Sequence, residues 1–466
     1  MVETILIFSS FVLAAGSILS FFSLQRGVGY LGRTRLAYLL VWMIGLGGTL
    51  LFAVIRIGGG EYDPVIGETG GGGFIAIGAI WFKRIVTALS LVTAVGVIAH
   101  FSTGKDRVLK TGTGLISAYF IFIIASFVLS SLFGTVPAFV PQLFYGPIML
   151  LALFMLNDIP LKGFVYHLKL VIGVVLVGSL LLCVKPDWAF SYTAQGILIP
   201  GLSGRLAGLT AHPNQLGPLA VIYLLLEWYQ PSRAGVRIFF LGAALLTLLL
   251  AQSKTAWIAA IVAVGVLAAY YLISSRFLSE KGSSEMRFRA ALILSVAGVF
   301  SVIAFAGVLF SDELLIRSSF RYSALASLST FTGRTEIWEI TLQLWERNPW
   351  FGYGPTLWGQ EFRAKFLMLY VGQAHNQVIQ TLGDSGLVGL AGLLIYLGTL
   401  VVYAIRTASY TRGISLALVS FLLLRCGTET PIRTLAVIDA TFFMHFMIFG
   451  FLLFAANDSL SDSRHR

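Results

Sequence analysis

The chain has few charged side chains. Asp, Glu, Lys and Arg make up 11% of its 466 residues, hydrophobic residues make up 57%, and the mean hydropathy is +0.87. Soluble domains carry about 25% charged residues. This shortage of charge excludes a soluble globular domain and predicts an all-α fold, in which a polytopic bundle of helices spans a membrane.

Metal-binding spacings and nucleotide-binding loops are missing from the sequence. The only cysteines, Cys183 and Cys426, lie in or beside apolar runs, and their spacing matches no metal site. The glycine run at 70–73 is not followed by Lys and Ser or Thr, as a phosphate-binding loop requires. We therefore predict that the protein uses no metal and no cofactor.

Long apolar runs are abundant, and most are close to the roughly 20 residues that cross a bilayer. They occur at residues 2–24, 36–56, 75–100, 112–132, 135–156, 164–184, 211–228, 236–252, 255–273, 290–310, 386–405, 413–425 and 434–456. Because the run at 413–425 is short, we expect 12–13 transmembrane helices.

The net charge of +11 is concentrated in alternate connections between these runs, which argues against a nucleic-acid partner. The basic residues there are Arg26, Arg33, Arg35, Lys105, Arg107, Lys110, Lys162, Arg233, Arg237, Arg276, Lys281, Arg287, Arg289, Arg406 and Arg412. The positive-inside rule makes these connections cytoplasmic. Strict alternation over thirteen runs then puts the N-terminus outside and the C-terminus inside.

The outward connections would include residues 58–73, 185–210 and the long segment 311–385. We expect a transmembrane bundle over 1–310, a large helical loop over 311–385, and C-terminal helices with a short cytoplasmic tail over 386–466. In the large loop, the stretch TGRTEIWEITLQLWERNP predicts a helix that stops at Asn348-Pro349.

His375 lies on the predicted outer face, within GQAHNQVIQTLGDSGLVGL (372–390), at the start of an expected short helix over 376–383. The positive end of a helix disfavours an imidazolium, and a general base must be neutral. The alternative is that His375 or Asn376 only caps the helix. Sequence physics alone leaves both interpretations open.

Several basic residues share that predicted face. They are Arg205, Lys254, Arg317, Arg321 and Arg334. Guanidinium and ammonium groups at bilayer depth can bind a diphosphate. Ordinary basic residues at a membrane interface also extend their charged groups toward water. The pattern by itself therefore does not separate a diphosphate site from ordinary interfacial residues. His212 precedes Pro213 at the start of an apolar run and could serve as a helix cap.

Five motifs in order resemble the O-antigen ligase and polysaccharide polymerase superfamily. They are RLAGLTAHPNQLG (205–217), SKTA (253–256), GRTEIW (333–338), NPWFGYG (348–354) and AHNQVIQTLGDSGLVGL (374–390). The resemblance implies a bacterial inner-membrane glycosyltransferase that is inverting, metal-independent and active on the periplasmic side. Its donor would be a glycan on undecaprenyl diphosphate, and its acceptor lipid A–core or a lipid-linked repeat unit.

The resemblance also assigns roles to single residues. The family's essential loop histidine falls on His375, and the essential arginine of its Gly-Arg motif falls on Arg334. The family's arginine before the membrane helix corresponds to Arg205. The family's Ser-Arg motif reads Ser253-Lys254 here, which keeps the charge but loses bidentate binding. Lysine at this position resembles the exopolysaccharide-polymerase branch slightly more than the lipopolysaccharide ligases. Asn376, His212 and Asn214 would support the site.

Two alternatives stay open at this stage. His375 could take the acceptor proton or bind the diphosphate. Ionisable residues in or near the last spans, Arg425, Glu429, Asp439 and His445, are typical of a transport path, so a lipid-linked oligosaccharide flippase is the main rival. A peptidoglycan-type glycan polymerase is a more distant one. Membrane lipids would surround the protein in every case.

Overall fold

The computed structural model gives the arrangement of most of the chain. It describes residues 33–57, 61–62, 69–70, 74–103, 111–156, 159–192, 199, 202, 204–278, 332–365, 371–432 and 439–465. The predicted spans at 2–24 and 290–310, and residues Arg317 and Arg321, lie outside the described residues.

Long helices form the bundle. They are α2 (Arg33–Ile57), α3 (Phe74–Thr103), α4 (Thr113–Ile123), α6 (Tyr145–Met155), α7 (Leu161–Leu181), α9 (Pro213–Tyr229), α10 (Ala234–Ala251), α11 (Lys254–Leu278), α17 (Gln377–Thr407), α18 (Ile414–Thr428) and α19 (Ala440–His465). The π-helical turn η1 (Ile124–Val128) and α5 (Leu129–Phe133) continue α4 without a break. The all-α fold class is thus confirmed.

The remaining elements connect these helices. They are the 3₁₀ turns η2 (Pro141–Phe144) and η3 (Leu182–Val184), the helices α8 (Pro186–Ala189), α15 (Thr332–Arg347) and α16 (Gln360–Lys365), and the strands β1 (Glu61–Tyr62), β2 (Thr69–Gly70), β3 (Phe190–Ser191) and β4 (Arg205–Leu206). The strands form two antiparallel pairs, β1 with β2 and β3 with β4. Helix α15 ends just before the predicted stop at Asn348-Pro349.

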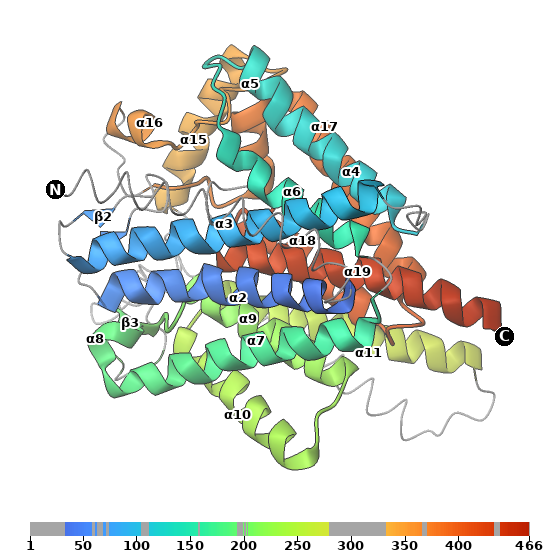
Figure 1. Ribbon diagram of the computed structural model, residues 1–466. Helices are drawn as coiled ribbons and strands as arrows, with labels where there is room; N and C mark the ends of the chain where they lie inside the picture. Colours follow the sequence, from blue (N-terminus) through green and yellow to red (C-terminus); the bar gives the residue numbers. More distant parts are fainter. Residues whose placement is uncertain are drawn as a thin grey trace, which may run out of the picture.

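The centre of the bundle is α19, which is apolar on all sides, as expected for a helix surrounded by others. Phe443, Phe446 and Phe449 are fully buried, and α19 contacts α2, α6, α7, α9, α17 and α18. In Figure 1, α2, α3 and α7 run side by side across the view, and α15 and α16 lie together at its upper left.

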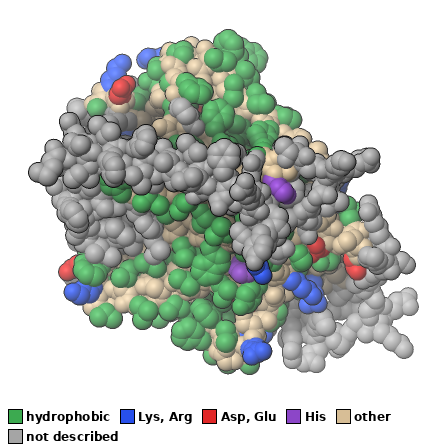
Figure 2. All heavy atoms as spheres, viewed as in Figure 1, with side chains coloured by type: hydrophobic (Ala, Val, Ile, Leu, Met, Phe, Trp, Pro, Cys, Tyr) green, Lys and Arg blue, Asp and Glu red, His purple; other side chains and the backbone are tan. Residues whose placement is uncertain are grey.

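The outer surface of the bundle is apolar. Figure 2 shows hydrophobic side chains over much of the described surface, with most charged side chains toward its edges. Leu181, Ile238 and Ile405 are each more than 60% exposed. Such a surface suits contact with lipid rather than with water. The protein is therefore a multi-pass membrane protein.

Six helices among the described residues are long and apolar enough to cross a membrane. They are Thr113–Phe133, Leu161–Val184, Ala234–Ala251, Lys254–Leu272, Gln377–Thr407 and Ala440–Asp462. Shorter apolar helices occur at Arg35–Gly47, Arg84–His100, Gln142–Met155 and Ile414–Thr428. The predicted total of 12–13 spans stays a prediction, since part of the chain lies outside the described residues.

The predicted span at 135–156 is wrong in its first third. Thr135 and Val136 instead donate backbone hydrogen bonds to Gly352 and Tyr353, at 3.0 and 2.7 Å, and the helix α6 begins only at Tyr145. Pro137 and Pro141 explain the difference, because a proline lacks the N–H group that a helix interior needs. This segment thereby anchors the loop at 348–354 to the bundle.

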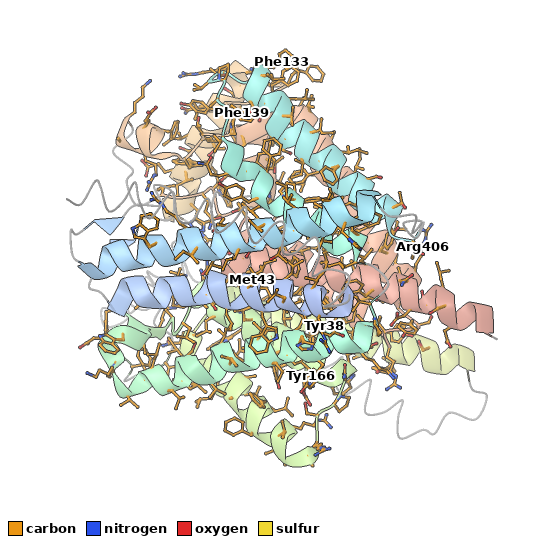
Figure 3. The ribbon with its side chains drawn as sticks, viewed as in Figure 1. Tyr38, Met43, Phe133, Phe139, Tyr166 and Arg406 are labelled. Atoms are coloured by element: carbon orange, nitrogen blue, oxygen red, sulfur yellow. The ribbon has the colours of Figure 1, made fainter. Side chains whose placement is uncertain are left out.

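Helices α4 and α17 pack together and run in opposite directions. Gly114 at the start of α4 lies beside Tyr403 near the end of α17, whereas Gly392 lies beside Phe122 and Ala125. In Figure 3, Phe133 at the end of α5 is therefore far from Arg406 in the last turn of α17. The basic end of α17 and its N-terminal end face opposite sides of the bundle.

Candidate functional site

Polar residues gather at the end of the bundle where several helices begin or end. Among the described helices, α9, α11 and α17 begin there, and α10 and α18 end there. The start of a helix carries a partial positive charge and free N–H groups, which favour anions. The sequence places His375, Lys254 and Asn214 at or next to these helix starts, so this end of the bundle is suited to a negatively charged ligand.

The loop before α17 is held in a fixed conformation. Asn376 is the N-cap of α17, and its side chain accepts hydrogen bonds from the N–H groups of Val378 and Ile379 at 2.9 and 3.1 Å. His375 has a φ of 50°, in the left-handed region that few non-glycine residues adopt. Asn376 is thus the cap, and the side chain of His375 is left for another role.

His375 pairs with an acidic residue that is distant in sequence. Its Nδ1 lies 2.9 Å from Oε2 of Glu429, which directly follows α18. The Glu429 side chain is 7% exposed, whereas the His375 side chain is 31% exposed. The carboxylate is therefore buried behind an imidazole whose outer part is open.

Glu429 is the centre of a wider hydrogen-bond network. Its carboxylate accepts from the amide groups of Gln373 at 3.0 Å and Asn214 at 3.1 Å, and Arg334 lies 3.8 Å from Oε1. Burial by itself would raise the pKa of this carboxyl. The hydrogen bond from His375 and the surrounding positive charges outweigh burial and lower the pKa to about 2. Glu429 is therefore a carboxylate at neutral pH.

Arg205 reaches the same network from β4. Its guanidinium donates to Oδ1 of Asn214 at 2.7 Å and to the carbonyl of Ala251, at the end of α10, at 3.3 Å. Asn214 connects Arg205 to Glu429, and its Oδ1 also accepts from the hydroxyl of Ser253 at 3.2 Å. Arg205 is buried, so its charge is held close to the site rather than spread into water.

Arg334 and Lys254 complete the group that the sequence predicts. Arg334, in the first turn of α15, donates from Nη1 to the carbonyl of Thr428 at 3.1 Å. Lys254, the first residue of α11, is half-buried, and the charges of Arg205 and Arg334 both act on its ammonium group. The structure thus brings Arg205, Lys254, Arg334 and His375 to one place.

His212 acts as the N-cap of α9. Its Nδ1 accepts a hydrogen bond from the N–H of Asn214 at 3.1 Å. This outcome matches the capping interpretation of the sequence. The side chain of Asn214 joins Arg205 to Glu429, and its supporting role in the site stays a prediction.

Aromatic residues of the loop hold its backbone. The indole N–H of Trp338 donates to the carbonyl of Ala374 at 2.7 Å, next to His375. Trp358 is fully buried in a small apolar cluster with Ile337, Leu344 and Phe362. Trp350, in the turn that follows α15, is by contrast strongly exposed, at 63%. The hydrogen bond to Ala374 therefore accounts for Trp338, and burial in the apolar cluster accounts for Trp358.

Sequence reasoning did not assign Glu429, Gln373 and Arg425 to the site. Arg425, in α18, is buried, and its charge acts on Glu429. Within the described residues, its Nε and Nη1 have no hydrogen-bond partner. The signal in the sequence was the pair of ionisable residues Arg425 and Glu429, close to the short apolar run at 413–425. Such a pair is equally typical of a transport path.

Comparison of the sequence with known protein families gives a match, which includes several residues of the site. Residues 238–394 match the family described as O-antigen ligase. The match covers residues 238–394 alone and supports a relationship to the O-antigen ligase and polysaccharide polymerase superfamily. The matched segment includes Lys254, Arg334 and His375, whereas Arg205 precedes it and Glu429 follows it. A search of curated proteins gives no match.

The match with the O-antigen ligase family supports a general function for the site. It supports glycan transfer of the ligase or polymerase type, with lipid-linked glycans as substrates. Candidate membrane spans begin or end beside the site, at Ala251, Lys254 and Gln377, which agrees with a lipid-linked substrate. The donor, the acceptor and the roles of single residues do not follow from the match.

Proposed function

We propose that the protein transfers a glycan from undecaprenyl diphosphate to a sugar hydroxyl, with His375 as general base. The observation that carries the proposal is the 2.9 Å contact between His375 and Glu429, beside Arg334 and within reach of Arg205. A base and a group of cations at one end of a membrane bundle match the two ends of this reaction, the acceptor hydroxyl and the diphosphate.

The charge balance favours an anionic donor. The basic side chains of Arg205, Lys254, Arg334 and Arg425 outnumber the carboxyl groups of Glu429 and Asp439 beside them. In a buried site, unbalanced charge is costly unless a ligand neutralises it. A diphosphate would do so, and the same cations would stabilise the negative charge that develops as it leaves.

The transfer balances as one displacement. His375 takes the proton of the acceptor hydroxyl, and the oxygen attacks the anomeric carbon of the donor. The bond between that carbon and the phosphate oxygen breaks, and its electrons stay on undecaprenyl diphosphate. A single displacement inverts the anomeric configuration. Proton transfer to a positioned base typically contributes 10²–10⁴-fold to the rate.

The setting of the reaction belongs to the same proposal. The site would face the periplasm from the bacterial inner membrane, and the acceptor would be lipid A–core or a lipid-linked repeat unit. Analysis of a deletion strain separates these acceptors. A ligase defect leaves polymer unattached to the core, whereas a polymerase defect shortens the surface polymer to single repeat units.

A matched pair of histidine variants tests the proposal. His375→Gln should lower release of undecaprenyl diphosphate at least 100-fold, because glutamine cannot accept the proton. His167→Gln is the control, since His167 lies in α7 and accepts a hydrogen bond from Trp42, away from the site. The purified proteins are reconstituted in liposomes with lipid-linked glycan extracted from a deletion strain. Wild-type activity in His375→Gln would refute the base, and movement of glycan without diphosphate release would indicate a flippase.

A further inference from the structure

The hydrogen bond between His375 and Glu429 carries information about where the proton of the imidazole sits. An ionised carboxylate has acceptors only, so the Nδ1 atom that contacts it must carry hydrogen. In a neutral imidazole, Nε2 is then the nitrogen with the free lone pair. The two nitrogens of His375 therefore have different chemical capacities.

We propose that Glu429 is a positioning residue, which holds His375 with hydrogen on Nδ1 so that Nε2 accepts the proton of the acceptor hydroxyl. This inference rests on the proposed transfer reaction. The inference also favours the role of base over that of diphosphate ligand for His375. A neutral Nε2 without hydrogen can accept a proton but cannot donate a hydrogen bond to a phosphate. Glu429 itself does not touch the reacting atoms.

The neighbours of His375 support this assignment of hydrogen. The amide nitrogen of Gln373 lies 3.4 Å from Nδ1 but only 3.0 Å from Glu429 Oε2. The other end of that amide, Oε1, accepts from the hydroxyl of Thr430, which fixes its orientation. Gln373 thus donates to Glu429 and does not compete for Nδ1.

Glu429 is unsuited to be the base itself. Its Oε1 accepts from Asn214 and lies near Arg334, and its Oε2 accepts from Gln373 and contacts His375. The side chain is 7% exposed, and its lowered pKa makes it a poor proton acceptor. What remains for this carboxylate is to orient the imidazole and to stabilise the imidazolium that forms.

Hydrogen bonds that do not involve Glu429 fix the backbone around His375. The direction of the His375 side chain then depends on Glu429. Gln380 accepts from the N–H of Ala374 at 2.7 Å, Trp338 donates to the carbonyl of Ala374, and Asn376 donates to the carbonyl of Gly427 at 3.3 Å. These bonds maintain the left-handed conformation of His375. With the backbone held, loss of the carboxylate should change the imidazole and leave the loop in place.

Glu429→Gln tests the inference, because glutamine has nearly the same shape but carries no charge and can donate to Nδ1. A donor in this position selects the tautomer with hydrogen on Nε2, which removes the base. In serine proteases, the corresponding Asp-to-Asn change lowers kcat about 10⁴-fold. We expect a kcat loss of roughly 10²–10⁴-fold, with a much smaller change in KM, and an acidic limb of the pH profile displaced to lower pH. Glu429→Asp should recover part of kcat.

The control is Glu227→Gln. Glu227 is also a buried carboxylate, but it pairs with Lys169 near the other end of α9. It reports the effect of neutralising a buried acid away from the site, and we expect it to keep the wild-type pH profile. A kcat loss in Glu429→Gln that Glu227→Gln shares would overturn the inference.

Nitrogen NMR provides a readout that does not depend on activity. The chain has six histidines, so protein labelled with ¹⁵N-histidine in detergent gives few signals, and His375→Gln identifies that of His375. We expect hydrogen on Nδ1 in the wild type and on Nε2 in Glu429→Gln. The same tautomer in both proteins would overturn the inference. If the wild type releases no diphosphate, the proposed function fails, and the NMR result still decides the role of Glu429.

Discussion

At the scale of single residues, the site depends on a few side chains that join distant parts of the chain. Glu429 contacts residues that lie 54, 56, 95 and 215 positions away in sequence, His375, Gln373, Arg334 and Asn214. Each of these contacts involves a charged group, which makes the hydrogen bonds stronger than neutral ones. The network therefore fixes both the geometry and the charge of the site.

Arg334 is predicted to act on the donor rather than on the acceptor. Arg334→Ala should lower kcat/KM for the lipid-linked donor roughly 10- to 100-fold, because a hydrogen bond to a charged group contributes about 1.5–3 kcal/mol. Steady-state kinetics with varied donor measures the effect. Arg347→Ala is the matched control, since Arg347 is the exposed last residue of the same helix, α15. Equal donor kinetics in the two variants would contradict a phosphate role for Arg334.

At the scale of elements, a break in α17 sets the direction of the segment that begins beside His375. Gly386 has a φ of 61° and a ψ of −157° inside this helix. The next residues, Leu387 and Val388, donate to the carbonyls of Pro349 and Trp350 at 2.8 and 3.1 Å. The short helix expected over 376–383 and the span expected from 386 are thus two parts of one kinked helix, which the loop at 348–354 braces.

Gly386→Ala is expected to destabilise the protein and to reduce activity. A Cβ atom there would lie 2.4 Å from the carbonyl carbon of Trp350 and 2.5 Å from the oxygen of Pro349. The unfavourable backbone conformation alone costs about 1–3 kcal/mol. Gly398→Ala, in the same helix with open space around it, should be neutral or stabilising by up to about 1 kcal/mol. Thermal unfolding in detergent compares the two, and equal stability would refute the bracing role of the kink.

At the scale of the whole molecule, Glu429 ties helix ends together. Its partners come from α9, from α15 and from the loop before α17, and it follows α18 itself. The apolar contacts within the bundle do not depend on charge, whereas the contacts at the site end of the bundle do. Protonation of one carboxyl group should therefore loosen the site end of the bundle before the rest.

The stability of the protein should depend on this carboxyl at acid pH. The pKa of Glu429 is lowered to about 2 in the folded protein, below its ordinary value of 4.5. The unfolded state then binds the proton more readily, so the contribution to stability is complete above about pH 4.5 and disappears as the pH falls toward 2. The difference in Tm between wild type and Glu429→Gln should shrink over that range. A difference that is constant from pH 6 to pH 3 would contradict the lowered pKa.

Much of the fold and part of the site could be predicted from sequence. Hydropathy locates most helices because each must present an apolar surface to lipid or to its neighbours. The cap at Asn376, the stop at Asn348-Pro349 and the cap at His212 follow from local backbone chemistry. Pro137 and Pro141, which shorten the span at 135–156, are present in the sequence, but hydropathy measures only apolar character and does not register the missing N–H groups.

The sequence by itself determined an all-α membrane protein and indicated His375, Arg205, Lys254 and Arg334 as candidate site residues, because composition and motif order are properties of the chain alone. Only the tertiary structure decided that these residues meet, and that Glu429 rather than a closer acidic residue holds His375. The reason is physical: which helix ends become neighbours depends on how apolar surfaces pack over long sequence separations, and no local pattern records that packing.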